Sequence, residues 1–458
     1  MIMRFQKTNR SAYLNYLHSK YEAWSGEIVV QSSPYIMGID PSSICQLRCP
    51  ICPTGVENES RRVGEKISIR NRTMLESDLF IALLDEVGEK LFYIMFYNWG
   101  EPLLNKRLPD YLRKTKSLQI CTEIHTNLSF RISDEYMQEI LTSGVDIIAA
   151  SIDGFSQENY QQYRRGGNFD LCLENITRLA TMRDRLGLQT DIIWNFLVFS
   201  FNEHEIDLAR KYCEENGITF NQREAYIDKP EWLPSYRREE ANASSAEKPA
   251  GQPSQKGMAK SPVPCSWHYN YSLVNADGSV SPCCAPWEQI HDFGHLRPGL
   301  ITFGDIWNNP LFQKSRAVFA EIAALDLEDV DTLCMHCPYD ASIQNLYSYL
   351  DNEVEKQFFK EVAQIDPLLE HAFHLLSNRP NFLKFYRQNL LGRSPSHPIQ
   401  ISLPRLLQLR VSRGVYQAKA QVPIVRTLLR QKLTPSYSRV ARRFPIVSRL
   451  AQPLKRIL

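Results

Sequence analysis

The chain has 458 residues with 43% hydrophobic and 23% charged side chains, a composition typical of a globular protein with two or three domains. No uninterrupted apolar run reaches 18 residues, so no transmembrane helix is expected. The N-terminus lacks the apolar core and cleavage site of a signal peptide, which predicts a cytoplasmic protein whose eleven cysteines are reduced.

The net charge of +2 is unevenly distributed along the chain. Residues 379–458 contain 17 Lys and Arg and no Asp or Glu, so residues 1–378 carry a balance of −15. An acidic body is therefore followed by a basic tail. Apolar residues alternate with Arg in this tail, which predicts short amphipathic helices interrupted by Pro.

Residues 1–34 are expected to form a helical extension, and residues 35–240 then alternate β-rich and helical segments. Strands are predicted at YIMGID (35–40), YIMFYNW (93–99), ICTEIHT (120–126), IIAASID (147–153), IIWNFLV (192–198) and ITFNQREA (218–225). Helices are predicted at residues 76–91, 133–144, 169–187 and 202–217, and several of them end in Gly. This alternation predicts parallel βαβ units, in which ligands gather at the carboxyl ends of the strands.

The remaining segments follow in order after this α/β region. Residues 241–262 are rich in small polar residues, Pro and Gly, and are expected to form a flexible linker. A cysteine-containing segment is predicted at 263–345, a helical segment at 346–378 and the basic tail at 379–458.

The first group of cysteines lies in a loop directly after the first predicted strand. Cys45, Cys49 and Cys52 have a C-x₃-C-x₂-C spacing, and Pro50 and Pro53 lie among them. A structural zinc site would need a fourth ligand nearby, and a four-iron cluster normally takes four thiolates. Three thiolates leave one iron open, which indicates a cluster whose open iron is the working position.

This loop resembles that of the radical S-adenosylmethionine (radical SAM) family, and the resemblance extends over about residues 30–340. It implies a partial (β/α)6 TIM-like barrel with a [4Fe-4S] cluster on three cysteines. In the family, S-adenosylmethionine (SAM) binds the open iron and is cleaved reductively. The resulting 5′-deoxyadenosyl radical takes a hydrogen atom from the substrate.

Further motifs carry the same resemblance, each at the end of a predicted strand. NWGEPLL, with Gly100 and Glu101, is similar to the family's GGEP motif, and Trp99 stands in place of the first Gly. The family's acidic residue at this place meets the SAM amino group. HTN ends at Asn127, which matches the family's TNG motif with Leu128 instead of Gly.

The next strand ends in SIDG, residues 151–154. The resemblance implies that Ser151 and Asp153 face the SAM ribose and carboxylate. In YRRGGNF the spacing matches an Arg that relatives place on the methionine carboxylate, and Arg164 is preferred over Arg165.

Strand periodicity selects three further candidates for a catalytic role inside the barrel. Glu123 and His125 share parity with Asn127 and are expected to line the interior below it. The alternative is a polar pair bonded to neighbouring backbone. Cys121 has the same parity and is a candidate donor of a hydrogen atom to a substrate radical, as in radical epimerases.

The second group of cysteines comprises Cys265, Cys283, Cys284, Cys334 and Cys337. NADG between the first two predicts a hairpin turn. Spacing alone does not separate zinc from iron–sulfur. In a chain that resembles radical SAM enzymes, the arrangement is similar to a SPASM domain in its shortened, twitch form. The resemblance implies one auxiliary [4Fe-4S] cluster on Cys265, Cys283, Cys334 and Cys337, with Cys284 left over.

The substrate is not fixed by the residues, and two classes follow from the resemblance. One is maturation of a ribosomally made peptide, and the other is oxidation or epimerisation of a sugar, cyclitol or polyol. A non-enzyme alternative is an iron–sulfur electron-transfer protein. An external one-electron reductant such as flavodoxin or ferredoxin is expected in either enzyme case.

The basic tail leaves several partners open. It could lie on an anionic membrane surface, dock on the acidic body, hold an acidic peptide substrate, or remain solvated. No nucleic-acid partner is expected, since no aromatic stacking motif accompanies the charge.

Overall fold

The computed structural model describes residues 9–238 except 66, 226 and 228, residues 265–319, residues 366–391, and a few single positions between 332 and 358. These residues all belong to one compact unit. The predicted linker at 241–262 and most of the basic tail, residues 392–458, lie outside the described residues.

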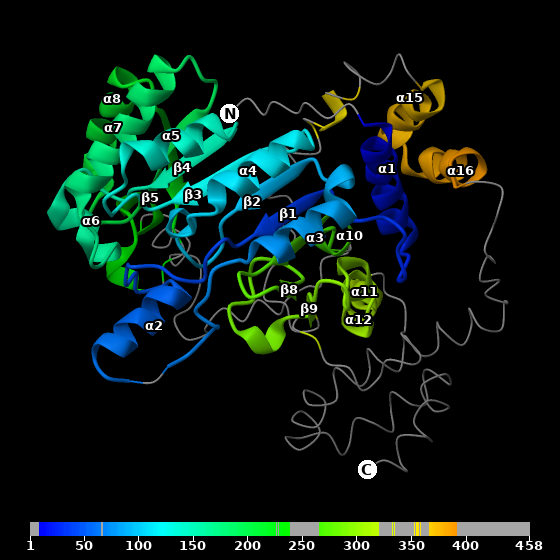
Figure 1. Ribbon diagram of the computed structural model, residues 1–458, viewed down its shortest axis with the longest axis horizontal. Coiled ribbons are helices and arrows are strands. Elements are labelled where there is room, and N and C mark those ends of the chain that lie inside the picture. The colour runs from blue at the N-terminus through cyan, green and yellow to red at the C-terminus, as the bar shows by residue number, and fades with distance from the viewer. Residues whose placement is uncertain are drawn as a thin grey trace, which may run out of the picture. The chain divides into compact units, whose positions relative to one another are not determined.

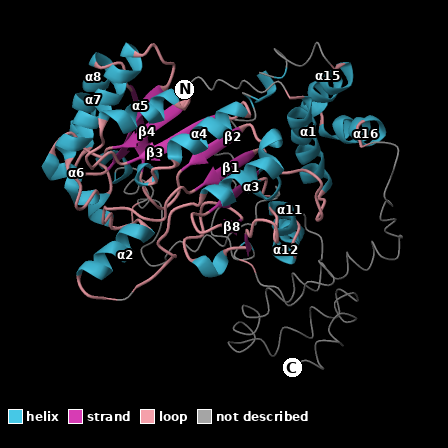
Figure 2. Ribbon diagram, in the orientation of Figure 1, coloured by secondary structure: helices cyan, strands magenta, loops and turns pink. Residues whose placement is uncertain are grey.

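The described strands form one nine-stranded sheet in the order β6-β5-β4-β3-β2-β1-β7-β8-β9. Figure 2 shows β4, β3, β2 and β1 side by side in it. The first six are parallel neighbours, and their bounds are β1 Ile36–Ile39, β2 Tyr93–Phe96, β3 Cys121–Thr126, β4 Ile147–Ser151, β5 Asp191–Val198 and β6 Thr219–Glu224. Each predicted strand is present, which confirms the α/β partial barrel.

Helices connect the parallel strands, and α3, α4 and α5 lie along the strands in Figure 1. The connections are α2 Pro53–Arg62 and α3 Ser77–Val87, then α4 Leu108–Ser117, α5 Asp134–Thr142, α6 Gln157–Tyr163 with α7 Phe169–Arg185, and α8 Ile206–Glu215. Helix α3 shows why they pack here, because its buried residues Phe80, Leu83, Leu84 and Val87 repeat at the spacing of one helix face.

The two faces of the sheet hold different side chains. In β3, Ile124 belongs to the large core that includes the helices, whereas Cys121 belongs to a second cluster with Tyr93 and Met95. Since side chains alternate along a strand, Glu123 and His125 lie on the same inner face as Cys121. Cys121, Glu123 and His125 therefore share one face of β3, as their spacing in the sequence predicts.

The auxiliary segment continues the barrel sheet at its β1 edge. Strand β7, Tyr271–Val274, pairs with β1 in parallel, and β8, Ser279–Ser281, and β9, Gly294–His295, follow as antiparallel neighbours. The predicted turn at residues 275–278 joins β7 to β8. The hydroxyl of Tyr271 lies where a side chain at Gly38 would be, so β1 needs Gly there.

Helices from the two ends of the described chain pack together through aromatic rings. Helix α1, Arg10–Ser25, contacts α15, Pro367–His374, and α16, Arg379–Asn389. The rings of Tyr16 and Phe373 stack with centroids 5.6 Å apart, and those of Tyr21 and Tyr386 with centroids 5.1 Å apart.

The position of α16 changes the expected start of the tail. The sequence places the basic tail from Arg379 onward, but residues 379–389 form this packed helix, with Phe382 and Tyr386 buried. A truncation of the tail therefore belongs after residue 391. Among the residues that the structure describes, no helix is long and apolar enough to cross a membrane.

Candidate active site

The loop between β1 and α2 brings three thiols together. Cys52 occupies the N-cap position of α2, and Cys49 is buried. Burial raises the pKa of all three thiols, and Glu101 and the two other thiols raise that of Cys45 further. All three cysteines are free of disulfides.

Asn58 on α2 holds the first half of this loop in place. Its Nδ2 donates to the backbone oxygens of Cys45, at 2.8 Å, and Leu47, at 2.7 Å. Arg72 in turn donates from Nη1 to Asn58 Oδ1 at 2.7 Å. Asn58 belongs to none of the sequence motifs above. Its place six residues after Cys52, on the helix that begins at this cysteine, is the signal that could have identified it.

Glu101 lies against the cluster loop and is 1% exposed. Its backbone N–H donates to Ile44 O at 2.8 Å, and its carboxylate accepts from Thr126 Oγ1 at 2.6 Å and from Asn127 N at 2.8 Å. Burial raises the pKa of Glu101 to about 7 despite these donors. Gly100 is required here, because a Cβ would collide with the backbone oxygen of Ser42.

Asn127 also reaches the cluster loop. Its Nδ2 lies 3.6 Å from Cys45 Sγ, and its Oδ1 accepts from Gln46 Nε2 at 2.7 Å. Leu128, which stands where the family has Gly, has a φ of 51°. A non-glycine side chain in this left-handed region is uncommon, so the turn at Leu128 has a cost in backbone strain.

Arg164 lies within the same site, and Asp153 holds it there. Asp153 is fully buried, and its Oδ1 accepts from Leu197 N at 2.9 Å while its Oδ2 pairs with Arg164 Nε at 2.6 Å. Burial raises the pKa of Cys49, and the nearby guanidinium of Arg164 offsets part of this rise. Asp153 therefore orients Arg164, and its predicted place beside SAM stays a prediction.

Ser151 and the alternative arginine, Arg165, lie in the same region of the barrel. Ser151 is half-buried at the end of β4, in register with Asn195 of β5. Arg165 contributes its backbone oxygen to Arg48 N at 2.9 Å, whereas the side chain of Arg164 reaches Asp153 and Cys49. The structure therefore favours Arg164 over Arg165 as the arginine of the site.

Glu123 and His125 form a hydrogen-bonded pair on the inner face. His125 Nε2 lies 2.5 Å from Glu123 Oε1, and the Tyr93 hydroxyl donates to Glu123 Oε2. Burial alone would raise the pKa of Glu123, but His125, Tyr93 and Arg223 of β6 together hold it below its ordinary value. A carboxylate in this state orients the imidazole, whose ring stacks on Tyr97 with centroids 3.8 Å apart.

Cys121 lies deeper in the barrel than this pair. It begins β3 and is 2% exposed, six residues before Asn127, which contacts the cluster loop. At about 3.3 Å per residue, that separation is about 20 Å along the strand. The structure thus places Glu123 and His125 between Cys121 and the cluster loop.

The second thiol group gathers around Cys283. Burial raises the pKa of Cys283, and the nearby Cys284, Cys334 and Cys265 raise it further. Cys337 lies outside the described residues. Burial raises the pKa of Cys284 to about 11, and its omission from the ligands stays a prediction.

The donor chemistry of both groups fits iron–sulfur clusters. Within the described ranges, no three His, Cys, Asp or Glu side chains converge on a site for a single metal ion. Several thiols near one another are the ligands that four-iron clusters use. Cys45, Cys49 and Cys52 would hold one cluster, with Glu101, Asn127 and Arg164 beside it.

Comparison with known families agrees with both assignments. Residues 39–208 match the radical SAM superfamily, and residues 265–338 match the SPASM iron–sulfur cluster-binding domain. The second match begins at Cys265 and includes Cys337, so all four predicted auxiliary ligands lie inside it.

Several known proteins are similar to the chain. The PqqA peptide cyclase of Granulibacter bethesdensis is 23% identical over 293 residues, 59% of this chain and 73% of that protein. A probable GTP 3′,8-cyclase of Methanococcus maripaludis is 28% identical over 174 residues, 38% of this chain and 53% of that protein, so the chain spans about half of that relative.

The solved structure of Streptococcus suis SuiB has a TM-score of 0.45 at 16% identity and covers 65% of this chain and 71% of its own. The assignment rests on the two matched domains and on the cysteine groups that lie inside them. The chain belongs to the radical SAM superfamily, with a SPASM-type auxiliary iron–sulfur domain after its radical SAM domain.

Proposed function

We propose that this radical SAM enzyme modifies a ribosomally made peptide. The observation that carries the proposal is the extent of the similarity to the PqqA peptide cyclase. Its 293 aligned residues reach beyond the radical SAM domain at 39–208, whereas the 174-residue match to the GTP cyclase is about as long as that domain alone. The peptide-acting relative is thus similar over more of the chain.

Transfer of deuterium from substrate to 5′-deoxyadenosine tests this proposal. Anaerobically reconstituted protein is mixed with SAM, dithionite and either a peptide fraction or a small-molecule fraction from host cells grown on deuterated medium. The peptide fraction is expected to deliver deuterium to 5′-deoxyadenosine, because the hydrogen comes from a substrate C–H bond. Deuterium delivered only from the small-molecule fraction would instead favour a sugar, cyclitol or polyol substrate.

The pair of Glu123 and His125 is proposed as the proton acceptor of the reaction. SAM bound at a four-iron cluster supplies the radical that removes a hydrogen atom. The Glu123 carboxylate accepts from His125 Nε2, which leaves Nδ1 to take a proton from the substrate radical. The electron that remains on the substrate after loss of the hydrogen atom and the proton would pass to the auxiliary cluster. Cys121 is not needed in this scheme, since it lies below the pair. A flavodoxin- or ferredoxin-type protein remains the proposed electron donor.

Replacing His125 by Gln should separate SAM cleavage from product formation. Because a general base contributes about 10²–10⁴-fold, conversion of the peptide should fall by at least about 100-fold while 5′-deoxyadenosine still forms. Mass spectrometry of the peptide and chromatography of 5′-deoxyadenosine give the ratio of modified peptide to 5′-deoxyadenosine. The exposed His204, changed to Gln, is the matched control, and an equal ratio in both variants would contradict the assignment.

A further inference from the structure

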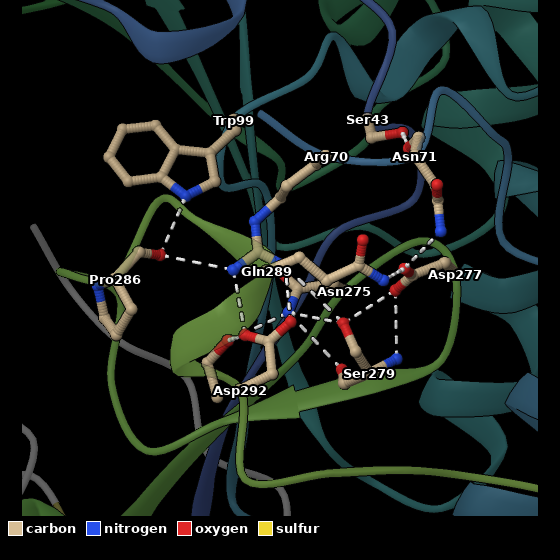
Figure 3. A network of polar contacts seen from close by, with 11 residues as sticks. Ser43, Arg70, Asn71, Trp99, Asn275, Asp277, Ser279, Pro286, Gln289 and Asp292 are labelled. Atoms are coloured by element: carbon tan, nitrogen blue, oxygen red, sulfur yellow. Dashed lines mark hydrogen bonds and ion pairs between the residues drawn. The ribbon is translucent and has the colours of Figure 1, made fainter. Parts of the chain in front are cut away.

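A buried arginine connects the barrel to the auxiliary hairpin (Figure 3). Arg70 lies in the segment between α2 and α3 and is 7% exposed. Its Nη1 lies 2.7 Å from Asp292 Oδ2 and its Nη2 lies 2.9 Å from Asp292 Oδ1. Such a two-pronged pair fixes orientation as well as distance, because the guanidinium and carboxylate planes must match.

The same guanidinium reaches the loop that follows the auxiliary cysteines. Arg70 Nη2 donates to Pro286 O at 3.4 Å, and Trp99 Nε1 donates to the same oxygen at 3.4 Å. Pro286 is two residues after Cys284. Trp99, which replaces the first Gly of the family's GGEP motif, therefore extends from the SAM loop to the auxiliary domain.

At its other end, the segment that carries Arg70 is joined to the first cysteine loop. Ser43 Oγ donates to Asn71 O at 2.6 Å and accepts from Thr73 N at 2.8 Å, and Ser43 N donates to Thr73 O at 3.0 Å. Ser43 is two residues before Cys45. The segment at residues 70–73 thus links the neighbourhood of Cys45, through its backbone, to that of Cys284, through the Arg70 side chain.

Arg70 also faces a second buried carboxylate. Asp40 ends the first strand and is 1% exposed, and neither of its oxygens has a full hydrogen bond from a described residue. Arg70 Nε is likewise buried without a partner among the described residues. Burial raises the pKa of Asp40 to about 7, and nearby N–H groups and the charge of Arg70 limit the rise. The buried guanidinium of Arg70 is therefore ion-paired with Asp292 and close enough to Asp40 to lower the pKa of that carboxyl.

We propose that Arg70 is a positioning residue that fixes the auxiliary cluster relative to the SAM cluster. The hairpin is attached to the barrel by backbone pairing of β7 with β1. That pairing leaves the loop at residues 283–292 to be oriented by side chains. Arg70, with Trp99, supplies this orientation through Asp292 and Pro286. The proposal holds for any substrate, since it concerns only the two clusters.

The test uses Arg70→Lys in the full-length protein with both clusters. Lys keeps the charge but offers no planar fork, so it cannot hold Asp292 and Pro286 together. We expect the iron content to stay at about eight per chain. We also expect pulsed EPR of the dithionite-reduced, SAM-free protein to lose the resolved dipolar interaction between the two clusters. Trp99→Phe, which removes a single donor, should cause a smaller change in the same direction.

A charge reversal gives the rescue. Arg70→Asp combined with Asp292→Arg should restore part of the dipolar interaction that Arg70→Asp alone loses. The exposed pair Arg113 and Asp110, reversed in the same way, is the control and should leave the spectrum as in the wild type. An unchanged spectrum in Arg70→Lys would overturn the proposal. A fall to about four irons would also overturn it, because Arg70 would then be needed to build the cluster site.

Discussion

A protein in which Cys45, Cys49 and Cys52 are all replaced by Ala is expected to hold about four irons per chain instead of about eight. It should form no 5′-deoxyadenosine, because the three thiols that would hold the SAM cluster lie in this one loop. The auxiliary thiols gather separately around Cys283, so their cluster should remain. Iron and sulfide analysis after anaerobic reconstitution, with chromatography of the SAM products, measures both effects.

Cys213 provides the matched control for this variant. It is fully buried in the core on α8, far in sequence from both thiol groups. Cys213→Ala should keep about eight irons and the wild-type yield of 5′-deoxyadenosine. About eight irons in the triple variant would contradict the ligand assignment. Tightly bound zinc together with only about four irons in the wild type would contradict the auxiliary iron–sulfur cluster.

Glu101→Gln is expected to weaken SAM binding by at least about tenfold, or about 1.4 kcal/mol. The substitution removes a charged partner for the SAM ammonium. It also places an amide N–H₂ against one of the two donors from which the carboxylate accepts, Thr126 Oγ1 on Oε1 or Asn127 N on Oε2. Equilibrium binding of SAM to the reconstituted protein measures the loss. Glu135→Gln, on the exposed face of α5, is the control for charge alone.

The same residue should make SAM binding depend on pH. Because burial raises the pKa of Glu101 to about 7, the carboxyl is mostly protonated at pH 6 and mostly ionised at pH 8. Wild-type affinity should therefore rise across this range, and Glu101→Gln should remove the rise. The folded state binds the extra proton, so the stability contribution of this group falls as pH increases from about 4.5 to about 7. Equal affinities and equal pH slopes in both proteins would show that Glu101 does not meet the ammonium.

The strands were predictable because their signal is local. Each is a short apolar run bounded by helical or turn residues, and the first cysteine loop follows directly from the position of β1. Helix α2 was not predicted, because it lacks such a local apolar signal. Its buried residues include Thr54, Gly55, Glu57 and Ser60, so no apolar stripe marks it in the sequence.

Contacts between distant segments were not predictable from one sequence. Arg70 and Asp292 are 222 positions apart, and nothing in either neighbourhood indicates the other. Asp153 illustrates a second limit, because the motif match did not indicate its ion pair with Arg164. The start of the tail was set by charge alone, and Phe382 and Tyr386 of α16 show that aromatic packing decides that boundary.

The parallel pairing of β1 with β7 has a consequence for biosynthesis. Ile36 emerges early from the ribosome, but its partner Tyr271 follows only after the whole barrel has been made. At about 5–20 residues per second, the β1 edge waits on the order of ten to fifty seconds for that partner. An open strand edge is a template for wrong pairing, so the nascent barrel is exposed to aggregation during this interval. The hairpin of β7 and β8 thus also covers the open edge of β1 and ends the period in which that edge can pair wrongly.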